Sequence, residues 1–387
     1  MNAAALRDRL AGEIDAMLDE TAALVAVDSG SYDPAGVNAV SAAMAAPLQA
    51  LGFAVARAPL AGRGDCVAAT LRLGDGPGVV VVGHADTVWP AGTAAEWPFA
   101  RDSGFASGPG AGDMKGCVVM AVHAIAAARD AGLDGIGALT VLIVPDEELG
   151  SPGSRAWIED HVRGAGACLG LEAGWPGDGV VTERGAVGAL QVRARGRTAH
   201  VADDDAHERG ASAIAALAPL VTEIEALGGE TGSLSVGIFR GGTARQVVPD
   251  EAELHVDLRA RDQAAADVLV AKLRSLVAQR AGRGVTLAVE GGVTRPAFPR
   301  DRSDALFALA QRRAGELGRT LTAHRTRGGS DASFAAALGV PTLDGLGPIC
   351  HDSCARTERI EVASLADRGA LLATLLADLA AGWRAGR

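Results

Sequence analysis

The chain has 387 residues, of which 48% are hydrophobic and 21% charged, and a formal net charge of −11. A single hydrophobic core rarely supports this length, so two domains are expected. The acidic balance, the lack of a basic run and an aromatic content of 3% argue against binding to nucleic acid or to an anionic membrane surface.

The N-terminal 27 residues have an apolar period of about 3.6 residues, with charges spread through them. This pattern predicts an amphipathic helix and not a signal peptide. The sequence contains no run of about 18 uninterrupted apolar residues, so we expect no transmembrane span. The five cysteines are an odd number and are widely spaced, apart from Cys350 and Cys354. This usage predicts a cytoplasmic protein without a disulfide framework.

Helices and strands alternate through the first part of the chain. We expect helices at 36–51, 114–131 and 153–163, and strands at 65–72, 78–84, 138–144 and 167–171. Such alternation predicts an α/β domain with a mixed, mostly parallel sheet and helices on both faces. The four valines at 79–82 are typical of a strand that is buried on both sides.

The pattern changes after residue 180, where strands begin to alternate apolar and polar residues. We expect strands at 186–196, 232–242, 251–261 and 284–292, and helices at 209–227 and 263–281. One polar face per strand predicts an antiparallel sheet with two helices on one side. A strand within 339–348 and a closing helix at 362–383 return to the α/β style. We therefore predict one domain from 1–182 and 297–387, and an inserted α+β domain from 183–296.

Acidic side chains follow several of the expected strands of the first domain. They come directly after the strands, or after a glycine-rich loop, at Asp86, Asp113, Asp146, Glu147, Glu148 and Glu172, and His84 stands at the end of the strand before Asp86. The carboxyl ends of parallel strands meet at one edge of a sheet, where carboxylates packed together repel unless a cation neutralises them. One histidine with several carboxylates suits zinc or a related divalent ion with open coordination positions.

Two pairs of residues at this edge suggest that one member binds metal while the other has a supporting or proton-transfer role. Glu147 and Glu148 are neighbours past a strand end and should point in different directions, so one can bind metal while the other moves a proton between water and a leaving amine. In the same way Asp86 can accept the imidazole N–H of His84 and fix the orientation of the ring.

Four motifs then match a family in order and spacing: "GHADTVWP", "GPGAGDMKG", "PDEELGSPGS" and "LEAG". Together they resemble the aminoacylase and glutamate carboxypeptidase family of zinc-dependent metallopeptidases. The resemblance covers nearly the whole chain, including "VDSGSYDPAGVNAV" near its start and "GGSDASFAAAL" near its end.

The resemblance implies a site with two zinc ions per subunit, for which cobalt or manganese could substitute. Asp113 would bridge the ions, His84 and Glu172 would complete one of them, and Glu148 would serve the other. Glu147 would be the general base and acid, and Asp86 would orient His84. The family also has a cis peptide after the bridging aspartate, here between Asp113 and Met114.

The last ligand of the second ion is ambiguous in "LGPICHDSCARTERIEV". The family has a histidine here, shortly before a glutamate, and counting back from Glu358 puts Cys354 nearest to that position. His351 stands three residues earlier. Imidazole and thiolate are both good zinc ligands, and we favour His351 because it keeps the family's ligand type, with Cys354 as the alternative.

The inserted domain resembles the family's lid, which also pairs two subunits, so a homodimer is expected. His200, in "GRTAH", would reach the partner's active site and stabilise the oxyanion. Arg259, Gly329, Ser330 and Asp331 match positions that hold the substrate's carboxylate, a task for which a guanidinium and backbone N–H groups are suited. Gln246 replaces an asparagine of the family and lengthens the reach of that amide.

These features predict an enzyme that hydrolyses an amide bond next to a free carboxylate in a peptide or an N-acyl amino acid. One alternative is a metal-independent serine amidase, although the sharp turn Gly-x-Ser-x-Gly is absent and "GGSDA" only approaches it. Another is a non-catalytic homologue that binds a metal or ligand, which would have no need of Glu147. The sequence does not name the substrate.

Overall fold

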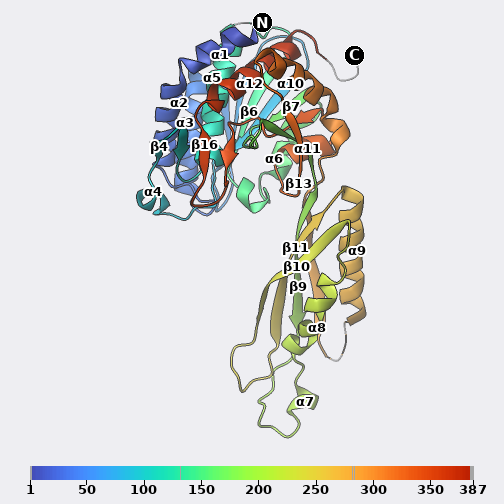
Figure 1. Cartoon of the computed structure of the whole chain (residues 1–387). Helices are drawn as coiled ribbons and strands as arrows, with labels where there is room; N and C mark the ends of the chain where they lie inside the picture. The colour runs from blue at the N-terminus through green and yellow to red at the C-terminus, as the bar shows by residue number, and fades with distance from the viewer. Residues whose placement is uncertain (1, 131, 281, 283, 384–387) are drawn as a thin grey trace. The chain divides into compact units, whose positions relative to one another are not determined.

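The computed structural model describes residues 2–130, 132–280, 282 and 284–383 (Figure 1). The chain forms two compact units. The first spans Met1–Glu183, Phe298–Thr326 and Ser330–Arg387, and the second spans Arg184–Ala297 and Arg327–Gly329. The second unit is therefore an insertion in the chain of the first.

The main sheet of the first unit is mixed, with a parallel centre. Its strands run in the order β1-β2-β6-β3-β7-β14. Strands β6, β3, β7 and β14 are parallel to one another, whereas β2 is antiparallel to both β6 and β1. The bounds are β1 Ala54–Pro59, β2 Asp65–Arg72, β3 Val79–His84, β6 Ala138–Val144, β7 Ala167–Gly170 and β14 Thr342–Leu343.

Helices cover both faces of this sheet. Val79 and Val81 of β3 belong to the core on one face, and Val80 and Val82 belong to the core on the other, because successive side chains of a strand point to opposite sides. The first face is covered by α1 Ala3–Ala11, α2 Ile14–Val25, α3 Pro34–Ala50, α5 Gly116–Asp130, α10 Asp304–Glu316 and α12 Ser364–Ala380. The second face is covered by α6 Arg155–Val162 and α11 Ala332–Ala337. The expected fold class is confirmed.

Two smaller sheets complete the first unit. One has the order β15-β16-β5-β4 and the other pairs β13 with β8. Their strands are β4 Ala100–Asp102, β5 Phe105–Ser107, β8 Gly179–Arg184, β13 Thr322–Thr326, β15 Cys350–His351 and β16 Arg359–Glu361. The remaining short elements are α4 Thr93–Glu96, an irregular turn at Ala111–Lys115 and single turns at Glu147–Leu149 and Arg300–Arg302.

The second unit is an antiparallel sheet with two helices on one face (Figure 1). Its strands run in the order β10-β11-β9-β12. The bounds are β9 Ala186–Arg195, β10 Gly232–Gly241, β11 Glu251–Ala260, β12 Thr286–Arg295, α7 Ala206–Arg209, α8 Ala213–Glu225 and α9 Gln263–Arg280. Leu190 and Val192 of β9 pack with Leu217 of α8 and Leu273 of α9 in one core, as the alternating pattern of the strands predicted.

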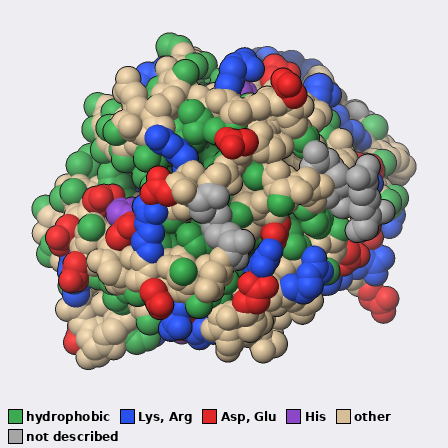
Figure 2. Space-filling model, turned by 90° about the horizontal axis from the view of Figure 1, so that it is seen from above, with side chains coloured by type: hydrophobic (Ala, Val, Ile, Leu, Met, Phe, Trp, Pro, Cys, Tyr) green, Lys and Arg blue, Asp and Glu red, His purple; other side chains and the backbone are tan. Residues whose placement is uncertain are grey.

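Sequence patterns located most of the long elements to within a few residues. The expected N-terminal helix is two helices, α1 and α2, and the expected strand at 339–348 is reduced to β14. The expected helix ends at residues 131 and 281 lie outside the described residues. The stretch Ala111–Asp130 is long and apolar enough to cross a membrane, but 83% of its apolar 18-residue window is buried inside the protein, as in a core helix. On the face shown in Figure 2, acidic and basic side chains lie interspersed.

Candidate metal centre

Three parallel strands deliver side chains to one edge of the main sheet. Strand β3 ends at His84, β6 ends at Val144 just before the Glu147–Glu148 turn, and β7 ends at Gly170 just before Glu172. Because β6, β3 and β7 are adjacent and parallel, their carboxyl ends lie together. The valine-rich strand β3 thus serves as a buried, rigid support for His84.

His84 is buried, with 1% of its side chain exposed, and both of its ring nitrogens have partners. Nδ1 lies 2.8 Å from the backbone oxygen of Asp86, and Nε2 lies 3.0 Å from Oδ1 of Asp113. Although burial opposes the charge, the hydrogen bonds to Asp113 and Asp86 raise the pKa of His84 well above its ordinary value. Its Nε2 therefore points at the carboxylate that would bridge two ions.

Asp113 lies in the irregular turn between β5 and α5. The peptide bond between Asp113 and Met114 is cis, as the family resemblance implied. A β-carbon on Gly112 would come within 2.3 Å of Cys350 Sγ, so only glycine allows this turn to approach β15 so closely. Burial opposes ionisation of Asp113, but the hydrogen bond and the charge of His84 hold its pKa down at about 2.

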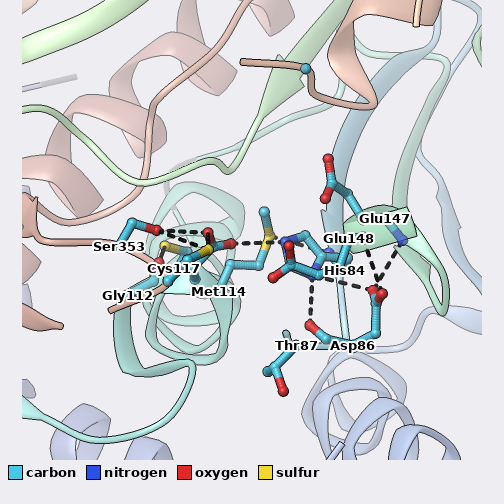
Figure 3. A network of polar contacts seen from close by, with 12 residues as sticks. His84, Asp86, Thr87, Gly112, Met114, Cys117, Glu147, Glu148 and Ser353 are labelled. Carbon is cyan, nitrogen blue, oxygen red and sulfur yellow. Dashed lines mark hydrogen bonds and ion pairs between the residues drawn. The ribbon is translucent and has the colours of Figure 1, made fainter. Parts of the chain in front are cut away.

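Asp86 does more than orient His84. Its Oδ1 lies 3.4 Å from Nδ1 of the ring, further than the backbone oxygen of the same residue. The carboxylate, which is fully buried, accepts hydrogen bonds from the backbone nitrogens of Glu147 and Glu148, both at 3.1 Å, and from the Ser31 hydroxyl at 2.7 Å. Figure 3 shows the contacts from Asp86 to the two glutamates. Asp86 thereby fixes the turn after β6 against the end of β3.

The described residues contain two groups of side chains whose ligand atoms lie within 4.8 Å of one another. One group is His84, Asp113 and Glu172, and the other is Asp113, Glu148 and Cys354. Asp113 is common to both groups, as a bridging carboxylate would be. Glu147 belongs to neither group, although it follows the same strand as Glu148.

These residues fit a divalent cation. Oε1 of Glu148 is buried and has no hydrogen-bond partner within the described chain, an arrangement that costs free energy unless a cation satisfies it. The pKa of Glu148 is raised mainly by burial and also by the charge of Asp113. The pKa of Glu172 is raised mainly by burial and also by the charge of Glu147. Nitrogen, carboxylate and sulfur atoms together form a donor set typical of zinc.

The structure places Cys354, not the preferred His351, beside the carboxylates. Sγ of Cys354 lies 3.4 Å from Oδ2 of Asp113. His351 lies in β15, where its Nε2 is 2.8 Å from Oε1 of Glu361 and its ring packs edge-on against Phe105. This geometry goes against our preference for His351, because Cys354 contacts Asp113 whereas the imidazole of His351 is engaged by Glu361.

Two residues near Cys354 were not identified as site residues in the sequence. Ser353 donates a hydrogen bond of 2.7 Å to Oδ2 of Asp113. Glu358 is fully buried and accepts hydrogen bonds from the backbone nitrogens of Gly112, Asp113 and Cys354. Burial, and to a smaller extent the charge of Asp113, raises the pKa of Glu358 to about 7. The glutamate that follows the expected ligand at a short distance was the only sequence signal for this residue.

Four of the expected substrate-binding and catalytic residues lie in the second unit. His200 is exposed, and its Nδ1 accepts a hydrogen bond from the backbone nitrogen of Ala202 at 3.2 Å. Arg259 is paired with Asp257 at 2.8 Å. Gln246 is exposed, and the backbone oxygen of Gly329 accepts a hydrogen bond from Arg184.

Ser330 belongs to the first unit and is buried. Its hydroxyl oxygen accepts a hydrogen bond from the backbone nitrogen of Ala332, the first residue of α11, at 3.2 Å. Asp331 is also buried, and its carboxylate accepts a short hydrogen bond from the Ser151 hydroxyl. Both side chains therefore have structural partners in this unit.

The first unit is an α/β unit with two groups of side chains that could hold a metal ion, and an antiparallel unit is inserted in its chain, as expected of a metal-dependent hydrolase. Residues 80–378 match Peptidase family M20/M25/M40, and the chain belongs to this family. This match covers more than half of the chain and agrees with the resemblance seen in the four motifs.

Two relatives and one solved structure illustrate the similarity. The chain is 28% identical over 370 residues to carboxypeptidase G2 of Pseudomonas sp. (strain RS-16), covering 93% of this chain and 88% of the relative. It is 30% identical over 346 residues to succinyl-diaminopimelate desuccinylase of Methylorubrum populi, covering 83% and 88%. The crystal structure of aminopeptidase PepT from Bacillus cereus has a TM-score of 0.74 at 23% identity, covering 95% and 99%, and supports the fold alone.

Proposed function

We propose that this hydrolase cleaves an amide bond next to a free carboxylate, in a peptide or an N-acyl amino acid, with two zinc ions and Glu147 as general base. The observation that carries the proposal is the pair of ligand groups that share Asp113, with Glu147 adjacent to one ligand but outside both groups. The names of the two relatives, a carboxypeptidase and a desuccinylase of an amino acid, agree with this class of substrate.

The proposed ligands divide into two sets. His84, Asp113 and Glu172 would hold one ion, and Asp113, Glu148 and Cys354 would hold the other. A bound zinc ion would polarise the scissile carbonyl and lower the pKa of water towards neutrality. Cobalt or manganese could take the same oxygen and nitrogen donors, whereas the thiol of Cys354 favours zinc and cobalt over harder ions.

The protein's own groups would perform the proton transfers. Glu147 would accept a proton from the attacking water and deliver it to the leaving amine. Asp86 would hold the backbone of the Glu147–Glu148 turn, so that the carboxylate of Glu147 keeps its position during both proton transfers. His84 would keep Nε2 directed at Asp113, because Nδ1 is engaged by the Asp86 backbone.

The second unit would supply substrate recognition. We propose that His200 acts across a homodimer interface to stabilise the oxyanion, and that Arg259, Gln246 and Gly329, together with Ser330 of the first unit, hold the substrate's carboxylate end. Arg259 would have to exchange its present partner Asp257 for the substrate. A cytoplasmic location remains a prediction from cysteine usage.

A substrate panel tests the proposal. We expect hydrolysis of some N-acyl amino acids or dipeptides, loss of activity on chelation and recovery on adding zinc. The matched control for each substrate is its C-terminal amide, which lacks the free carboxylate and should be cleaved much more slowly. Equal rates on the acid and on its amide would contradict the proposed substrate class, and full activity after chelation would contradict the mechanism.

A further inference from the structure

We infer that Glu358 is a positioning residue that holds together the two segments carrying the metal ligands Asp113 and Cys354. Its Oε1 accepts hydrogen bonds from the backbone nitrogens of Gly112, at 2.8 Å, and Asp113, at 3.2 Å. Its Oε2 accepts one from the backbone nitrogen of Cys354, at 3.2 Å. One fully buried carboxylate thus joins segments that are more than 240 residues apart in the chain.

The backbone around Glu358 is fixed by the small sheet whose strands precede or follow both segments. Glu358 directly precedes β16, which pairs antiparallel with β5, and Arg359 lies opposite Ser107. Its own backbone nitrogen donates to the oxygen of Ala355 at 2.9 Å. The side chain therefore starts from a rigid position, and its two oxygens set the distance between the segments.

The contacts between the two segments depend on this distance. Ser353 donates to Oδ2 of Asp113 at 2.7 Å, and Sγ of Cys354 lies 3.4 Å from the same oxygen. Ser353 and Gly112, which Figure 3 labels, mark the two segments where they meet. A small shift of either backbone would separate the thiol from the carboxylate that would share an ion with it.

Cys354 has a further requirement for Glu358. Its φ is 61°, in the left-handed region that non-glycine residues rarely adopt, and the surrounding structure must maintain this conformation. The hydrogen bond from its backbone nitrogen to Glu358 is a direct restraint on it. Only a side chain with two acceptor oxygens can serve Cys354 and the Gly112–Asp113 turn at once.

The inference rests on the proposed function and predicts a selective effect on the second ion. Glu358→Gln keeps the size of the side chain but puts an amide NH₂ where one acceptor was, so it loses the contact with one segment. The ion held by Asp113, Glu148 and Cys354 should bind at least tenfold more weakly. The ion held by His84 and Glu172 should bind as in the wild type.

The matched control is Glu361→Gln, three residues further along the chain, at the end of β16. Glu361 pairs with His351 and contacts neither Asp113 nor Cys354 among the bonds of the described residues. Both variants and the wild type are depleted of metal and titrated with zinc against a competing chelator, which resolves the two affinities. Protection of the Cys354 thiol from alkylation by added zinc gives a second readout that does not depend on activity.

We expect two zinc ions in the wild type and in Glu361→Gln, and in Glu358→Gln one tight ion, one weakened ion and thiol protection only at higher zinc. If Glu358→Gln does not fold, Glu358→Asp, which keeps the charge but shortens the reach, should show the same selective weakening. Wild-type affinity for both ions in the folded variant would overturn the inference. A wild type that binds no second ion would instead contradict the proposed function, and with it this inference.

Discussion

The roles proposed for Glu147 and Glu148 differ because the surroundings of the two side chains differ. Both backbones are held by Asp86, but only Glu148 lies within ligand distance of Asp113 and Cys354. Adjacency in the chain after a strand predicted that the two carboxylates would point differently. It could not predict the role of Asp86 as an acceptor for both backbone nitrogens, because this role depends on how two strand ends meet.

Replacing Glu147 should therefore separate catalysis from metal binding. We expect Glu147→Gln to retain both ions and to lose about a hundred- to ten-thousand-fold in kcat, since the amide cannot carry the proton. Glu148→Gln is the matched control and should lose the second ion. Turnover and metal content of both variants check this, and near-normal turnover in Glu147→Gln would exclude the assigned general base.

The proposed binding of a metal ion by the Cys354 thiol can be tested by absorption spectroscopy. In the cobalt-substituted protein, a sulfur ligand should give a near-ultraviolet thiolate-to-cobalt absorption band. We expect the band to disappear in Cys354→Ser and in Cys354→His, with the histidine variant still binding two ions, and to persist in His351→Ala. A band that survives loss of the thiol, or a metal site lost only in His351→Ala, would restore the original preference for His351.

At the scale of elements, long periodic segments were predictable and short ones were not. Strands β2 and β6 have the predicted bounds, because their apolar runs are continuous and end at clear turns. Strands β4, β5, β15 and β16 have only two or three residues, too few for any period to show. Cys354 lies in the turn between β15 and β16, where it contacts Asp113, whereas His351 lies in β15. Counting along the chain pointed to Cys354, and His351 was preferred only because it keeps the ligand type of the family.

The buried ionisable groups around the candidate metal centre also predict how the free energy of unfolding depends on pH. The pKa values of Glu148, Glu172 and Glu358, and that of His84, are all raised in the fold above their ordinary values. Between about pH 4.5 and 7 the folded, metal-free protein thus binds more protons than the unfolded chain, and its free energy of unfolding falls as pH rises. The lowered pKa of Asp113, about 2, acts in the opposite direction but only below about pH 4.

Denaturant unfolding of the metal-free protein at several pH values between 5 and 8 measures this trend. We expect its stability to decrease across the range, and added zinc to restore stability most strongly at the high-pH end, where the carboxylates that it neutralises are ionised. Glu358→Gln should flatten part of the slope. Stability that rises with pH in the metal-free protein would contradict a cluster of carboxylates that needs a cation.

At the scale of the whole molecule, the fold class followed from the change in strand pattern after residue 180. Continuous apolar strands gave way to alternating ones, which distinguishes a sheet covered on both faces from one covered on a single face. The assignment of His200 to a partner's active site depends on assembly, which no pattern within one chain determines. It came from the family resemblance and is a prediction about the dimer.

Subunit exchange tests that prediction. In a mixed dimer of His200→Ala and Glu147→Gln subunits, one site would combine an intact Glu147 with the intact histidine of the other subunit. Random exchange of equal amounts would make half of the dimers mixed, each with one working site, so about a quarter of the wild-type activity should return. If no activity returns once exchange is complete, His200 does not act across the interface.

The central claim is that two zinc ions, bridged by Asp113, make this chain an amide hydrolase. The measurement that tests it most directly is a zinc titration of the metal-free protein, with bound zinc and hydrolysis of a substrate from the panel followed in the same sample. Our account predicts a plateau at two zinc ions per chain and activity that appears only as zinc binds. Full hydrolysis by the metal-free protein, or a plateau below two bound zinc ions, would contradict it.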